Sequence, residues 1–285
     1  MRFFLAAVAI VLLSLQGNSV AQAGAPPAVA LPSNLFSSED AALMESMLES
    51  VLPADDSVPP QIVQPTAVLP LMSPDLALHT YASRSARQTS DLASYTATTV
   101  IHAELPETKQ QGEYEVKRQY SAPKSLLFTA LHFTGDTFVK ANVILRLMQS
   151  EVDHVQKDDG RLVAISDANY RFAYKGLREM DGRPVHMYQL KPRKKRLGLI
   201  KGTMSLDART GSLVRLEGVP AKSPSVFLSK IKLEQDYADF GPFTLPVHVH
   251  SEAKASIVGK TIIDVYHHDY QVVPGAVQTA QGAGQ

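Results

Sequence analysis

The chain has 285 residues, with 28 basic and 28 acidic side chains, so no global field favours binding to nucleic acid. It contains no cysteine, which excludes disulfides, thiolate metal sites, a cysteine nucleophile and a lipid-modified N-terminal cysteine. This length suffices for one large all-β domain or for two small ones.

Residues 1–23 have the features of a secretory signal peptide. One basic residue, Arg2, precedes the uncharged run Phe3–Leu15, and the stretch ends in Ala21-Gln22-Ala23. The apolar run is too short to span a bilayer, and an uncleaved membrane anchor is the alternative. We therefore expect an exported protein that is soluble after cleavage, located in a bacterial periplasm.

Residues 24–73 are expected to form an N-terminal helix and a proline-rich linker. The helix would carry a continuous apolar stripe, which consists of Leu43, Met44, Met47, Leu48 and Val51. The prolines from Pro53 to Pro74 favour an extended, irregular link. Such a helix either packs on the protein's own body or docks on a partner or a lipid.

A second helix and a long series of strands follow. Ser73-Pro74-Asp75 is a strong helix start, and the period of the apolar residues changes to two after Ser94. The expected strands are Tyr95–Glu104, Gly112–Tyr120, Lys124–Phe133, four short strands between Ala168 and Pro220, Val226–Tyr237, Thr244–Ala253 and Lys260–Val272. Helical spacing returns only in Phe138–Glu151. The connections are too short for crossovers, so the sheet is expected to be antiparallel.

The order of these elements resembles the LolA/LolB-like family of bacterial periplasmic lipid-handling proteins. The shared features are helix Asp75–Gln88, a meander, a helical interruption and the string YRFAYKG…DGRPVHMYQLKP…GTMSLDARTGSLVRLEG. The resemblance implies an α+β fold, in which an open, strongly curved antiparallel sheet (an unclosed half-barrel) has helices plugging its concave side. This domain would occupy residues 74–273, before a disordered tail, 274–285. Residues 24–73 are extra to the family pattern.

The resemblance also implies a carrier that holds the acyl chains of a lipid or lipoprotein in an apolar cavity. The residues expected to line that cavity are Phe128, Phe133, Phe172, Tyr174, Tyr188 and Leu190. A slip of one residue in register would exchange the faces, so the sequence leaves the lining open. The alternative is a monomeric envelope module that senses or docks a protein partner without catalysis.

A basic run, formed by Arg193, Lys194, Lys195 and Arg196, follows the central strands. It is either a solvated loop or a contact for anionic headgroups or an acidic partner.

Chemistry at the histidines is the third hypothesis. His248 and His250 share a strand face, and His267 and His268 lie on the following strand, near Asp264. A His/His/Asp metal site is geometrically possible if these strands pair, while solvated or hydrogen-bonded histidines are the simpler interpretation. No G-x-S-x-G or H-E-x-x-H motif occurs. We therefore expect no enzyme, no cofactor and no metal.

Overall fold

The computed structural model describes residues 69–157, 160–223, 228–256 and 259–275. The predicted signal peptide, the N-terminal helix and almost all of the tail lie outside the described residues. Within the described part of the chain, no helix is long and apolar enough to cross a membrane.

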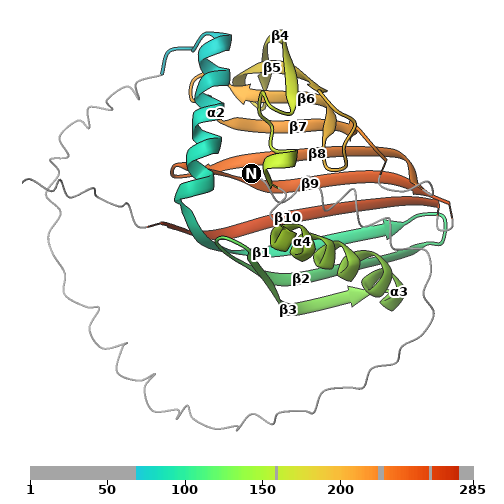
Figure 1. The fold of residues 1–285 in the computed structure, drawn as a ribbon. Coiled ribbons are helices and arrows are strands. Elements are labelled where there is room, and N and C mark those ends of the chain that lie inside the picture. The colour runs from blue at the N-terminus through green and yellow to red at the C-terminus, as the bar shows by residue number, and fades with distance from the viewer. Residues whose placement is uncertain (1–68, 158–159, 224–227, 257–258, 276–285) are drawn as a thin grey trace, which may run out of the picture. The chain divides into compact units, whose positions relative to one another are not determined.

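Ten antiparallel strands form one open sheet (Figure 1). They are β1 Leu92–Leu105, β2 Gln110–Ser121, β3 Ser125–Gly135, β4 Tyr170–Met180, β5 Arg183–Pro192, β6 Ile200–Asp207, β7 Leu213–Pro220, β8 Leu228–Phe240, β9 Phe243–Ala255 and β10 Gly259–Pro274. The strand order is β3-β2-β1-β10-β9-β8-β7-β6-β5-β4. The first strand therefore pairs with the last inside the sheet, and β3 and β4 are the two edges. The predicted open antiparallel fold is confirmed.

The helices lie on the concave side of the sheet (Figure 1). α2 spans Pro74–Asp91, and the predicted interruption consists of α3 Thr137–Val139, the π-helical turn η2 Lys140–Ile144 and α4 Leu145–Lys157. A short helix, α5 Gly160–Val163, appears where the sequence indicated only a turn. Because β3 and β4 are opposite edges of the sheet, the segment between them connects one edge to the other.

Alternation along the strands places the core on the inner face of the sheet. One row of buried inner-face residues, each paired with the next across eight strands, consists of Tyr188, Met204, Leu216, Gln235, Val249, Val265, Ile101 and Tyr114. The outer-face neighbours are mostly polar or charged. The period of two seen in the sequence therefore reports which face is covered.

Helix α2 is attached to the sheet at both ends by neutral hydrogen bonds. At its start, the Tyr188 hydroxyl donates to the carbonyl of Pro74 at 2.6 Å. At its end, the amide of Gln88 donates to the Thr244 carbonyl at 3.0 Å and accepts from the Thr244 N–H at 2.9 Å. Gln88 thus satisfies backbone groups of β9 that would otherwise be buried without partners.

Helix α4 is attached by a buried ion pair. The Arg118 guanidinium, on the inner face of β2, contacts the Glu151 carboxylate, and the two residues are 1% and 2% exposed. The Arg118 Nε also donates to the Tyr95 hydroxyl at 3.0 Å. Burial acts to lower the pKa of Arg118, but Glu151 and Tyr95 hold it above its ordinary value, so the guanidinium stays charged.

Candidate functional site

A pocket of about 440 Å³ lies between α2 and the connection from α5 to β4. Its volume falls within the range of roughly 300–1,000 Å³ that is typical of ligand sites. Its lining consists of Asp75, Leu78, His79, Tyr81, Ala82, Ile165, Ser166, Asp167, Ala168 and Phe172. Six of these ten residues are apolar or aromatic, and the four polar ones are Asp75, His79, Ser166 and Asp167.

One wall of the pocket is a face of α2. Leu78, Tyr81 and Ala82 share that face because they are three and four residues apart. Tyr81 is 3% exposed, and burial, followed by the proximity of Tyr170, raises the pKa of its hydroxyl above the ordinary value. Burial likewise raises the pKa of Tyr170 to about 12. Both phenols are therefore neutral at physiological pH.

The opposite wall is the connection from α5 to β4, which contributes Ile165, Ser166, Asp167 and Ala168. The side chain of Asn169 donates to the carbonyls of Arg161 and Ala164, each at 2.9 Å. The Nε of Arg193 donates to the carbonyl of Asp167 at 2.7 Å. These bonds fix the shape of a segment that has no regular secondary structure.

Phe172 contributes the sheet's part of the pocket. It lies on β4 opposite Leu190, and its ring centroid is 6.3 Å from that of Tyr170. Phe172 and Leu78 are both half-buried and pack against the main hydrophobic core. The apolar surface of the pocket is therefore continuous with the core.

The six residues predicted to line a cavity have different environments. Phe172 lines the pocket, Tyr188 and Leu190 are buried in the core, and Tyr174 is 45% exposed beside His186. Phe128 lies under the guanidinium of Arg118, and Phe133 lies under the ammonium of Lys140. A ligand-binding role for these six residues stays a prediction.

The four residues of the basic run have two kinds of environment. Arg193 donates to the carbonyl of Asp167 in the pocket wall, and Arg196 donates to the carbonyl of Leu162 in α5 at 3.3 Å. Lys194 and Lys195 are exposed. A headgroup or partner contact at these four residues stays a prediction.

Sequence reasoning missed most of the pocket. Leu78, Tyr81 and Ala82 have helical spacing in the sequence, a pattern that equally predicts core packing. Ile165 and Ala168 left no signal, because an irregular connection has no periodicity. Only the tertiary contact between the two segments makes a pocket.

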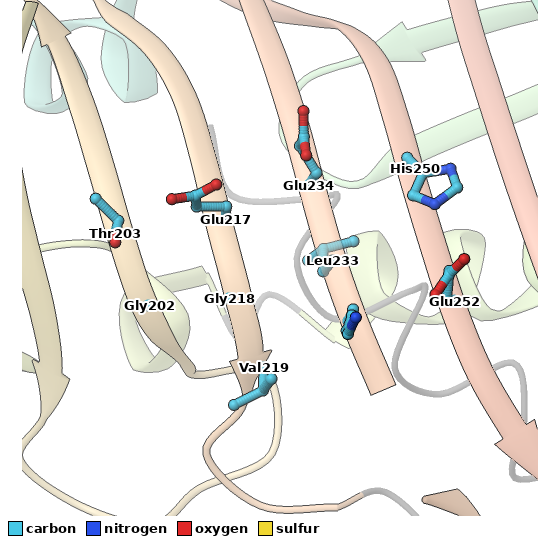
Figure 2. Close-up of a pocket in the computed structure, with 10 residues that line it drawn as sticks. Gly202, Thr203, Glu217, Gly218, Val219, Leu233, Glu234, His250 and Glu252 are labelled. Carbon is cyan, nitrogen blue, oxygen red and sulfur yellow. The ribbon is translucent and has the colours of Figure 1, made fainter. Parts of the chain in front are cut away.

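A second pocket, of about 560 Å³, lies where β7 and β8 separate beyond the pair Gly218 and Leu233 (Figure 2). Its charged residues alternate with inner-face residues, so they belong to the outer face of the sheet. Glu234 pairs with Arg215 at 2.9 Å, and Glu252 pairs with Lys260 at 2.8 Å. Because partners on the protein already neutralise these two carboxylates, this pocket is the weaker candidate.

The two histidines of β9, His248 and His250, form hydrogen bonds with Asp264 on β10. His248 Nε2 and His250 Nδ1 lie 3.0 and 2.8 Å from the same Asp264 oxygen. His267, by contrast, is buried, with its Nδ1 2.9 Å from the Thr99 hydroxyl. Within the described ranges, no three His, Asp or Glu side chains are placed to hold a metal ion.

No protein-family model and no curated protein matches the sequence. Similar solved structures include a domain described as an outer membrane lipoprotein-sorting protein from Vibrio parahaemolyticus. It is 11% identical, the alignment covers 72% of this chain and 95% of that one, and the TM-score is 0.37.

Two further solved structures have comparable similarity. A DUF1329 family protein from Desulfovibrio piger is 9% identical over 71% of this chain and 94% of that one, with a TM-score of 0.38. A LolA superfamily protein from Nitrosomonas europaea is 8% identical over 72% of this chain and 96% of that one, with a TM-score of 0.34. The LolA-like proteins that the sequence resembles are thus among these similar structures. All three TM-scores lie below 0.5, so the function proposed below rests on the chain's own residues.

Proposed function

We propose that this protein is a non-catalytic carrier that binds acyl chains, from a lipid or a lipoprotein, in the pocket between α2 and the α5–β4 connection. The observation that carries the proposal is a ligand-sized pocket whose surface is mainly apolar and continuous with the core. Burial of an acyl chain there would contribute about 0.8 kcal/mol for each methylene group. We further propose cleavage after residue 23 and action in the periplasm.

Native mass spectrometry of the mature protein, combined with lipid extraction, tests this proposal. We expect a bound lipid or acylated peptide, and uptake of a fluorescent fatty acid. Phe172→Asp should weaken uptake at least about tenfold, because it places a charge against the apolar chain. Leu177→Asp is the matched control, since Leu177 lies on the same strand, is 41% exposed and lies outside the pocket.

Two results would contradict the carrier function. One is a protein that is free of lipid and takes up no fatty acid. The other is an equal loss of uptake in Phe172→Asp and Leu177→Asp, which would show that the pocket is not the site.

A second function is favoured by edge strand β3. Its outward side chains Leu127 and Leu131 are 60% and 53% exposed. Among the described residues β3 pairs only with β2, so its outer edge can accept a further strand. An envelope protein that adds an extended segment there would make the chain a docking module. Leu127→Lys should abolish that association and leave fatty acid uptake unchanged.

A further inference from the structure

Two carboxylates lie at the polar side of the α2 pocket. Asp75 is in the first turn of α2, and Asp167 is in the opposite wall. Among the described residues neither side chain has an ion pair, in contrast to Glu234 and Glu252 of the outer pocket. Asp75, Asp167 and His79 are the exposed ionisable residues of the lining, whereas Tyr81 and Ile165 are buried, so the pocket is apolar inside and carries its two carboxylates at the rim.

Positive charge lies directly beside this rim. The Arg193 guanidinium donates to the backbone carbonyl of Asp167 at 2.7 Å. The first residue of the basic run therefore contacts the residue that supplies one rim carboxylate. The next two residues, Lys194 and Lys195, are exposed and have no ion pair among the described residues. The basic run thus starts beside Asp167, although none of its four residues belongs to the lining of the pocket.

We propose that the ligand is an aminophospholipid, whose headgroup carries both an ammonium and a phosphate group. The ammonium lies against Asp75 and Asp167, the phosphate against the side chains of the basic run, and an acyl chain against Leu78 and Phe172. This inference rests on the proposed function, because an acyl chain must enter the pocket before its headgroup reaches the rim.

Other headgroups match these charges less well. A lipid with a phosphate and no amine brings its negative charge close to two carboxylates, and like charges repel. A purely cationic amphiphile meets the repulsion of the basic run. An uncharged diacylglycerol gains nothing from either group. Only a zwitterionic headgroup with an exposed ammonium satisfies both kinds of charge.

Asp75 also has a structural role, which the experiment has to separate from binding. An acidic residue in the first turn of a helix interacts favourably with the helix dipole, so Asp75→Asn is expected to weaken α2 slightly. Asp167 lies outside any helix. Asp167→Asn is therefore the cleaner variant, and a change in headgroup preference, unlike a change in melting temperature, does not follow from a structural role.

The test compares the uptake of three lipids that carry the same acyl-linked fluorophore: phosphatidylethanolamine, phosphatidylglycerol and diacylglycerol. The mature protein should prefer phosphatidylethanolamine to phosphatidylglycerol at least about tenfold. Each of Asp167→Asn and Asp75→Asn should reduce the preference about fivefold, in line with a partly exposed ion pair. Glu179→Gln, which removes an exposed carboxylate of β4 outside the pocket, should leave the preference unchanged.

The outcomes separate the two levels of the proposal. Uptake of all three lipids with equal affinity would overturn the headgroup assignment and leave the carrier function intact. No uptake of any lipid would overturn the carrier function itself. A preference that survives in a folded Asp75→Asn/Asp167→Asn double variant would show that these carboxylates do not select the headgroup.

Discussion

The two helices that cover the inner face of the sheet are held by different forces. α2 contacts β6, β9 and β1 and is tied by hydrogen bonds between neutral groups, such as the amide of Gln88, and by a partly exposed ion pair between Arg84 and Asp239 at 2.9 Å. α4 contacts β3 and is tied by two buried charges, Arg118 and Glu151. A partly exposed ion pair contributes little to stability, whereas a buried ion pair is costly as soon as one partner is lost. Loss of a single side chain should therefore destabilise the α4 side more than the α2 side.

Removal of one charge on the α4 side should have the largest effect. Glu151→Met leaves the Arg118 guanidinium buried without its counter-charge, and we expect the free energy of unfolding to fall by about 3–5 kcal/mol. Urea denaturation measures this loss. The double variant Arg118→Met/Glu151→Met should recover most of it, because an apolar pair costs no desolvation. A double variant as unstable as the single one would contradict this view of α4.

A matched change on the α2 side should cost less. Gln88→Leu leaves the N–H and carbonyl of Thr244 without partners, which should lower the free energy of unfolding by about 1–3 kcal/mol. Thr89→Ala is the control, since among the described residues its hydroxyl donates to the carbonyl of Ser85 within the same helix and not to the sheet. The control should change stability by less than about 0.5 kcal/mol. Equal losses in both variants would show that Gln88 does not tie α2 to β9.

Acid should weaken the α4 side through His267. Burial, with a further contribution from the nearby positive charge of Arg118, lowers the pKa of His267 well below its ordinary value. Below about pH 6.5, His267 is protonated in the unfolded chain but stays neutral in the folded chain. The free energy of unfolding therefore falls as the pH drops below about 6.5. This residue contributes a slope of at most about 1.4 kcal/mol per pH unit.

Denaturation at a series of pH values tests this expectation. His267→Gln keeps a hydrogen-bonding group near Thr99 and removes the titration, so its stability should vary less between pH 7 and pH 5 than that of the natural protein. The same dependence on pH in both proteins would assign the acid sensitivity to other groups.

Local sequence patterns determined the elements of this fold. The Ser73-Pro74 start fixed α2, because the serine hydroxyl accepts from the N–H of Leu76 and proline suits the first turn. Alternation fixed the strands, and the helical spacing in Phe138–Glu151 fixed the interruption. Asp181-Gly182 and Thr210-Gly211, pairs typical of tight turns, each join neighbouring strands with glycine at positive φ.

Only the tertiary structure decided how these elements meet. Pairing of the first strand with the last joins residues such as Ile101 and Val265, whose separation in the chain leaves no trace in local periodicity. The charges of Arg118 and Glu151 look like ordinary surface residues in the sequence, because burial of a charged group depends on a partner that the fold supplies. The pocket has the same origin. Leu78 and Ile165 lie far apart along the chain, and packing of an irregular connection against α2 brings them to one site.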